Sequence, residues 1–124
     1  MSPQKILLVE DDDYILDFIN FALQRTGYEI TTVGDGAAAM EAVMKDPPDL
    51  IVMDCILPKM SGLQLCTELK SNSKSQSIPI ILMSASLRIK PEEIVETYGV
   101  ECFLRKPFHS VELLSAIDSV LKKG

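Results

Sequence analysis

Chemically active side chains follow four short apolar runs of this 124-residue chain. Glu10 and Asp11 follow the first run, Asp54 follows the second, Ser84 follows the third, and Lys106 stands two residues after the fourth. Carboxylates that share a cleft repel one another, and a hard divalent cation such as Mg²⁺ relieves the repulsion. A lysine offers a compact positive charge to a phosphoryl oxygen, and a carboxylate beside a metal can attack phosphorus. Together these residue types indicate metal-assisted phosphoryl chemistry at an aspartate.

The four apolar runs are continuous rather than alternating, which is typical of strands buried on both faces of a parallel sheet. A fifth and more mixed run, from Tyr28 to Val33, suits an edge strand. Helical patterns separate the runs, so the order is strand–helix five times over, and an α/β fold with helices on both faces of the sheet follows. Ligands of such sheets bind outside the carboxyl ends of the strands, where the polar residues stand. The buried runs are 6–9, 50–53, 80–83 and 102–104.

Capping residues mark where the helices begin. One of the three consecutive aspartates 11–13 is expected to cap the first helix, Asp35 the second and Ser61 the third. Pro91 fits the first turn of the fourth helix, and Ser110 is expected to cap the last.

Composition excludes several classes of protein. Eighteen acids against twelve bases give a net charge of −6, and residues 1–62 alone carry net −7. Nucleic-acid binding needs clustered Lys and Arg, so this domain is expected to bind none. The longest apolar runs have four residues and no signal peptide is visible, which indicates a cytoplasmic protein without a membrane span. Three cysteines without metal-ligand spacing are expected to be free thiols, with Cys55 buried and inert.

Each polar residue also has an ordinary structural explanation. An aspartate can cap a helix, a serine can satisfy backbone groups, and most lysines are simply solvated. If these explanations were correct, unrelated structural roles would by chance have placed polar residues at the ends of four different strands. The joint pattern therefore favours a functional site.

From Ile6 to about Leu121, the chain resembles the receiver domain of two-component response regulators. The resemblance implies a flavodoxin-like five-stranded parallel sheet in the order 2-1-3-4-5 with five helices, forming one domain over residues 1–124. The motifs that carry it are Ile6-Leu7-Leu8-Val9-Glu10-Asp11-Asp12, Asp49-Leu50-Ile51-Val52-Met53-Asp54 with Leu57-Pro58-Lys59-Met60-Ser61-Gly62, Pro79-Ile80-Ile81-Leu82-Met83-Ser84-Ala85, and Phe103-Leu104-Arg105-Lys106-Pro107-Phe108.

The resemblance implies a phosphoacceptor and a metal site. Asp54 matches the aspartate that is phosphorylated and that also binds the metal. Asp11 matches a direct ligand of Mg²⁺ or Mn²⁺, Glu10 matches a residue that holds the metal through water, and the backbone carbonyl of Ile56 matches the remaining protein ligand.

The resemblance also implies a conformational switch. Ser84 matches the hydroxyl that bonds the phosphoryl group, and Lys106, with a cis bond to Pro107, matches the lysine that pairs with it. Phe103 matches the aromatic switch position, where a phenylalanine cannot contribute the hydroxyl of a tyrosine. Phosphorylation would draw Ser84 toward Asp54 and free space for Phe103.

Partners follow from the resemblance. The phosphoryl donor would be a sensor histidine kinase or a phosphotransfer protein that docks near the first helix. The face of the fourth helix, fifth strand and fifth helix would bind a downstream protein or a tethered output domain, or form a homodimer. An ordinary solvated face is the alternative for its candidate contacts, Glu92, Glu93, Glu96 and Arg105. The chain is either a complete single-domain regulator or the receiver of a longer protein with a DNA-binding or enzymatic output.

Two other functions compete with this interpretation. A phosphohydrolase with Asp54 as nucleophile would need a general acid two residues on, where Ile56 stands. A flavin or nucleotide binder would need a Ser/Thr/Gly-rich loop after the first strand, where the acidic run stands. Apolar Ile56 and short Ser86, which flank the site, predict slow self-dephosphorylation.

Overall fold

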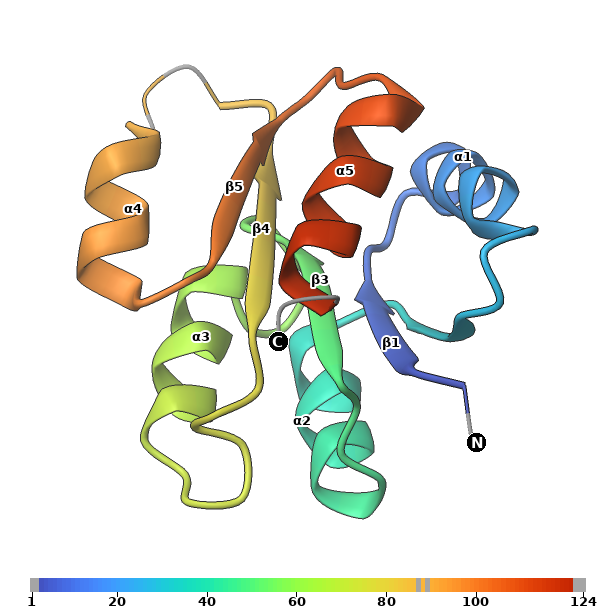
Figure 1. The fold of residues 1–124 in the computed structure, drawn as a ribbon. Coiled ribbons are helices and arrows are strands. Elements are labelled where there is room, and N and C mark those ends of the chain that lie inside the picture. Colours follow the sequence, from blue (N-terminus) through green and yellow to red (C-terminus); the bar gives the residue numbers. More distant parts are fainter. Residues whose placement is uncertain (1–2, 87, 89, 122–124) are drawn as a thin grey trace.

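One parallel sheet organises the chain. The computed structural model describes residues 3–86, 88 and 90–121. Five parallel strands pair in the order β2-β1-β3-β4-β5 (Figure 1). This topology confirms the flavodoxin-like α/β fold expected from the sequence. The strands are β1 Lys5–Val9, β2 Glu29–Val33, β3 Leu50–Asp54, β4 Ile80–Ser84 and β5 Cys102–Arg105.

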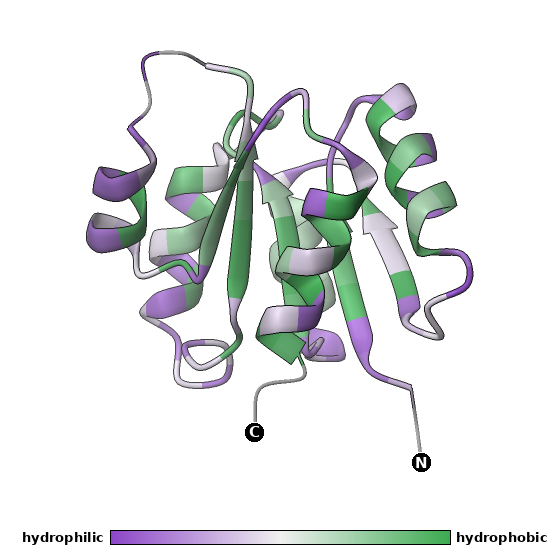
Figure 2. Cartoon of the chain, turned by 45° about the horizontal axis from the view of Figure 1, so that its top comes forward, coloured by the Kyte–Doolittle hydropathy of each residue, from purple (hydrophilic) through white to green (hydrophobic). Residues whose placement is uncertain are grey.

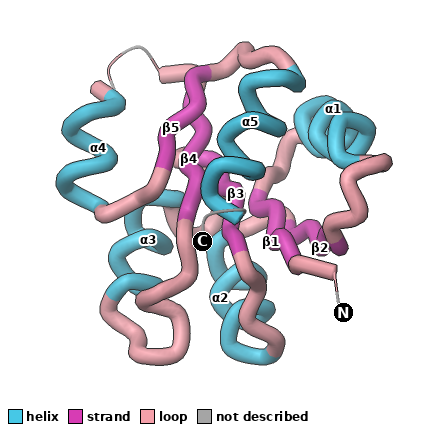
Figure 3. The backbone as a smooth tube through the Cα atoms, viewed as in Figure 1, coloured by secondary structure: helices cyan, strands magenta, loops and turns pink. Residues whose placement is uncertain are grey.

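Helices cover both faces of the sheet, and a helix follows each strand in Figure 3. α1 and α5 pack on one face, and α2, α3 and α4 pack on the other. None of the helices in the described part of the chain is long and apolar enough to cross a membrane. The helices are α1 Asp13–Leu23, α2 Gly36–Lys45, α3 Gly62–Lys70, α4 Pro91–Tyr98 and α5 Ser110–Leu121.

Two hydrophobic cores form because successive side chains of a strand point to opposite faces. In β1, Leu7 and Val9 pack beneath α2, α3 and α4, whereas Ile6 and Leu8 pack beneath α1 and α5. The same alternation runs through β3 and β4, whose residues are all buried. Figure 2 shows the central strands as hydrophobic, with the hydrophilic residues on helix surfaces and loops. The sheet is therefore anchored on both sides, which fixes where each strand ends.

The last strand is less buried than the sequence predicted. The run 102–104 was expected to be buried on both faces, but β5 lies at an edge of the sheet and only Leu104 of this run is buried. Cys102 and Phe103 are half-buried. A continuous apolar run reports hydrophobicity, not the number of neighbouring strands. The expectation that the second strand is an edge strand is confirmed.

Helix starts follow the expected caps in most cases. The Asp12 carboxylate accepts a hydrogen bond from the Tyr14 amide at 2.9 Å, which satisfies one of the free N–H groups at the start of α1. Asp35 caps α2 and Ser61 caps α3 in the same way. Pro91 occupies the first turn of α4.

The cap expected for the last helix is wrong. Ser110 is the first residue of α5 and not the residue before it. The preceding His109 donates its backbone N–H to the Glu112 carboxylate at 3.0 Å. Serine is favoured at a cap, but this acidic side chain three residues further on takes part in the turn instead.

The loop after β3 folds back against the backbone of Asp54. The Gly62 amide donates to the Cys55 carbonyl at 2.8 Å. A Cβ on Gly62 would lie 2.0 Å from the carbonyl oxygen of Asp54, so only glycine permits this contact. The close approach locks the end of β3 to the start of α3.

Replacing Gly62 with alanine tests this contact. We expect Gly62→Ala to lower the free energy of unfolding by about 2 kcal/mol, because the methyl group collides with backbone that cannot move aside cheaply. Urea denaturation measures the change. Gly34→Ala is the matched control, since a Cβ there meets nothing within 4 Å. Equal stability of the two variants would contradict the contact.

Candidate functional site

A cleft opens at the carboxyl ends of the strands. It brings together four of the residues singled out in the sequence, Glu10, Asp11, Asp54 and Lys106, from the ends of β1, β3 and β5. These residues lie far apart in the chain and meet because parallel strands end at one edge of the sheet. The cleft is lined by Glu10, Asp11, Asp12, Asp54, Ile56, Leu57, Pro58, Ala85, Ser86 and Lys106.

Lys106 links two buried carboxylates. Its ammonium donates to Oε1 of Glu10 at 2.7 Å and to Oδ2 of Asp54. The side chains of all three residues are largely withdrawn from water, at 13% exposed for Lys106, 1% for Glu10 and 12% for Asp54. The lysine therefore offsets most of the repulsion between the two acids.

Glu10 is held by the backbone as well as by the lysine. Its Oε2 accepts the amides of Asp11 and Asp12, each at 3.1 Å. Burial raises the pKa of Glu10, and the nearby charge of Asp54 adds to this, while the bonds from Lys106 and the Asp12 amide act in the opposite direction. Burial alone would lower the pKa of Lys106, but its bonds to Asp54 and Glu10 outweigh burial and raise it.

Asp54 ends β3 and faces the cleft. Its Oδ1 accepts the Ile56 amide at 3.0 Å, and its other oxygen bonds Lys106. Backbone pairing of Asp54 with Met83 of β4 and the contact with Gly62 hold the residue from both sides. The carboxylate is thus oriented before any ligand arrives.

The adjacent residues Asp11 and Asp12 occupy different environments. Asp12 caps α1, whereas Asp11 is exposed and lines the cleft. In the described part of the chain no three His, Cys, Asp or Glu side chains gather as metal ligands, and Lys106 stands between Glu10 and Asp54. Four of the residues that line the cleft, Glu10, Asp11, Asp12 and Asp54, carry carboxylates, and carboxylate oxygens are ligands that Mg²⁺ prefers. The donor set fits a magnesium ion.

Ser84 lies behind the cleft rather than at its wall. It ends β4, is fully buried, and is absent from the lining, which includes Ala85 and Ser86. Its hydroxyl oxygen accepts the Ser86 amide at 3.1 Å, and its carbonyl accepts the Lys106 amide at 2.9 Å. The peptide bond from Lys106 to Pro107 is cis, as expected.

Arg105 does more than the surface contact expected of it. The residue is half-buried, and its guanidinium donates to the Ser86 carbonyl at 2.5 Å. The same group lies 5.7 Å from the ring centroid of Phe103, the expected switch residue. Sequence reasoning missed both this contact and the role of Gly62. The only sequence feature that indicated the Arg105 contact is a basic residue directly after a predicted strand.

Cys55 and Cys66 are buried thiols rather than reactive ones. Burial raises the pKa of Cys55 to about 11 and that of Cys66 to about 12. Both stay protonated at neutral pH and are poor nucleophiles. The inert thiol expected beside Asp54 agrees with this environment.

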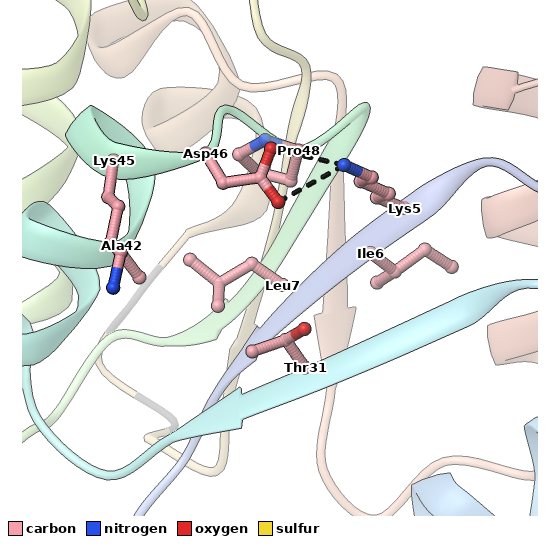
Figure 4. A pocket seen from close by; sticks show the side chains of 8 residues that line it. All are labelled: Lys5, Ile6, Leu7, Thr31, Ala42, Lys45, Asp46 and Pro48. Carbon is pink, nitrogen blue, oxygen red and sulfur yellow. Dashed lines mark hydrogen bonds and ion pairs between the residues drawn. The ribbon is translucent and has the colours of Figure 1, made fainter.

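A second cavity, of about 190 Å³, lies at the opposite end of the strands, by the start of β1 and the end of α2 (Figure 4). Leu7, Thr31 and Ala42 are among the residues that line it. Lys5 and Asp46 form an ion pair at 3.0 Å beside it. This cavity shares no lining residue with the acidic cleft.

Removing the lysine tests the charge balance. Lys106→Met keeps most of the side-chain volume, and we expect it to lower the free energy of unfolding at pH 7 by about 2–3 kcal/mol, because two buried carboxylates lose their partner. The pKa of Glu10, already raised, rises further. A raised folded-state pKa gives stability that is present below the unfolded value and lost as the pH rises through the folded value. The deficit should therefore shrink as the pH falls toward 4, which urea unfolding at several pH values measures.

Lys90→Met is the matched control for this experiment. The Lys90 side chain is 73% exposed and lies 3.9 Å from Glu93, so its loss should change stability by less than about 0.5 kcal/mol. A deficit in Lys106→Met that does not depend on pH, or that equals the control, would contradict the charge balance.

Comparison with known proteins agrees with this geometry. The model of the response regulator receiver domain matches residues 6–118. The sensory transduction protein RegX3 of Mycolicibacterium smegmatis is 33% identical over 123 residues, which cover 96% of this chain and 51% of that protein. The alkaline phosphatase synthesis transcriptional regulatory protein PhoP of Bacillus subtilis is 32% identical over 125 residues, which cover 98% and 50%. The chain spans about half the length of the curated relatives it matches.

Solved structures share the whole fold. A response regulator of Chloroflexus aurantiacus has a TM-score of 0.90 at 27% identity, and the match covers 98% of this chain and 99% of that one. The receiver domain of the sensor histidine kinase PA1611 of Pseudomonas aeruginosa, solved with magnesium coordinated in its active-site cleft, has a TM-score of 0.88 at 30% identity and covers 98% and 100%. Family model, relatives and structures coincide along the chain, which therefore belongs to the response regulator receiver domain family of two-component signalling.

Proposed function

We propose that Asp54 accepts a phosphoryl group in a reaction that requires Mg²⁺ or Mn²⁺, and that this modification switches the partner affinity of the domain. The observation that carries the proposal is the bridge from Lys106 to both Glu10 and Asp54 in a cleft lined by acids. The bridge supplies a nucleophilic carboxylate and a cation ready for a phosphoryl oxygen at one place.

The chemistry follows from these groups. A carboxylate oxygen of Asp54 attacks phosphorus, the bond from phosphorus to the donor breaks, and an aspartyl phosphate forms. Lys106 then bonds a phosphoryl oxygen in place of the carboxylate oxygen it holds now. Asp11, Glu10 and Asp54, with the Ile56 carbonyl, would hold the metal, which offsets negative charge on the transferred group. The Ser84 hydroxyl would donate to the phosphoryl group.

The phosphoryl donor is a sensor histidine kinase or a phosphotransfer protein that docks beside the cleft. α1 exposes Tyr14 at 87% and Phe21 at 76%, and α5 exposes Val111 at 73%. Phe18 is 40% exposed and packs against Phe108, their ring centroids 5.9 Å apart. Exposed aromatic side chains mark protein contacts, and Phe18 lines a pocket together with Lys106, Pro107 and Phe108.

The output is protein binding rather than turnover. Phosphorylation would alter the face formed by α4, β5 and α5, which would bind a downstream protein or an output domain in the same chain, or form a homodimer. Residues 1–124 would form one cytoplasmic regulatory domain that binds neither nucleic acid nor membrane. Ile56 leaves no general acid two residues after Asp54, which argues against a phosphohydrolase.

Incubation with acetyl phosphate and Mg²⁺ tests the phosphoacceptor. We expect intact mass to show one phosphoryl group on the wild-type protein and none on Asp54→Asn, because the amide is not a nucleophile of this kind. EDTA should abolish the adduct by removing the metal. Asp17→Asn, which changes an exposed aspartate of α1, is the control and should be phosphorylated like the wild type.

Each other result has a clear meaning. A phosphoryl group that persists on Asp54→Asn would contradict the assigned acceptor. Repeated consumption of acetyl phosphate without an adduct would favour the phosphohydrolase.

Ile56 should lengthen the life of the phosphoryl group. The side chain is 68% exposed and lines the cleft, where an apolar group gives an attacking water no hydrogen bond. We expect Ile56→Asn to speed loss of the phosphoryl group by roughly tenfold, since an amide can orient that water. A time course of intact mass after removal of acetyl phosphate measures the rate. Val111→Asn is the control, and equal rates in both variants would contradict the role of Ile56.

A further inference from the structure

Arg105 connects the edge strand β5 to the loop after β4. Its guanidinium donates to the backbone carbonyl of Ser86 at 2.5 Å and lies over the Phe103 ring at 5.7 Å. Both contacts are charge-assisted, the first as a hydrogen bond and the second as a cation–π interaction. One side chain thus touches both the loop beside the cleft and the expected switch residue.

The loop position determines where the Ser84 hydroxyl lies. The Ser86 amide donates to the Ser84 oxygen at 3.1 Å, so the two serines move together while this bond persists. Ser84 is fully buried and outside the cleft lining, whereas Ser86 lines the cleft. Ser84 must therefore shift to reach a phosphoryl group on Asp54, and Ser86 must follow it or release it.

We propose that Arg105 is a positioning residue that holds the Ser86 backbone against β5 and so keeps the Ser84 hydroxyl withdrawn from the cleft. The inference rests on the proposed phosphorylation of Asp54 and adds its regulation. Arg105 opposes the phosphorylated arrangement, because movement of Ser86 lengthens the bond to the guanidinium.

Arginine can couple the hydrogen bond to Ser86 with the position of Phe103. A guanidinium is planar, so it can lie against an aromatic ring while its edge donates to a carbonyl. A shift of the Phe103 ring removes one support of Arg105 and weakens its hold on Ser86. β5 sets the geometry, since Arg105 pairs in register with Ser84 itself.

Variants at Arg105 separate the hydrogen bond from the stacking. Arg105→Ala removes both contacts. Arg105→Lys keeps a charged donor but loses the planar group, so it should fall between the alanine variant and the wild type. Arg25→Ala removes the same charge from the exposed segment after α1 and is the matched control. Thermal unfolding first confirms that each variant folds.

The first measurement needs neither metal nor phosphoryl group. Hydrogen exchange followed by NMR reports how often the Ser86 amide leaves Ser84. We expect exchange in Arg105→Ala to be about tenfold faster than in the wild type, the effect of losing one charge-assisted hydrogen bond. Unchanged exchange relative to Arg25→Ala would overturn the inference.

The second measurement uses beryllofluoride with Mg²⁺ as a stand-in for the phosphoryl group. An NMR titration should show that Arg105→Ala binds beryllofluoride about tenfold more tightly than the wild type, because less is lost when Ser86 moves. Faster exchange without tighter binding would overturn the link to the site, as would weaker binding. A wild-type protein that binds no beryllofluoride would contradict the proposed function instead, and hydrogen exchange alone would then decide whether Arg105 holds the loop.

Discussion

The bridge from Lys106 to Glu10 and Asp54 is the interaction on which the cleft depends. Two acids buried side by side are unfavourable without a counter-charge, and the lysine supplies it from a different strand end. In the proposed function, the same arrangement makes the site respond to phosphorylation. A lysine that bonds carboxylates can bond a phosphoryl oxygen instead. A metal ion can offset the repulsion between the carboxylates in the same way as the lysine does.

The fold delivers this arrangement through its two cores. Alternating residues of β1, β3 and β4 pack beneath opposite helix layers, which fixes the level at which each strand ends. Gly62 then locks the loop after β3 against the backbone of Asp54. Packing well away from the cleft therefore determines the distance between the lysine and its acids.

Sequence reasoning succeeded where local patterns carry the information. The structure brings Asp54 and Lys106 together because parallel strands end at one edge of the sheet, and Asp35 and Ser61 cap helices as their types predict. It failed where residues distant in the sequence determine burial or hydrogen bonding. The run 102–104 does not reveal that β5 has one neighbour, and the partner of Arg105 is a backbone carbonyl 19 residues away, which no local pattern encodes. The start of α5 was misplaced because a serine is not the only way to satisfy a helix end.

The site at which the phosphoryl group is attached tests the central claim most directly. Borohydride reduces an aspartyl phosphate to an alcohol, so treatment of the phosphorylated protein followed by peptide sequencing identifies the modified residue. The account predicts reduction at Asp54 alone, because this carboxylate is oriented by the Ile56 amide and Lys106 at the cleft. Reduction at Glu10 or Asp11 with Asp54 intact would contradict it.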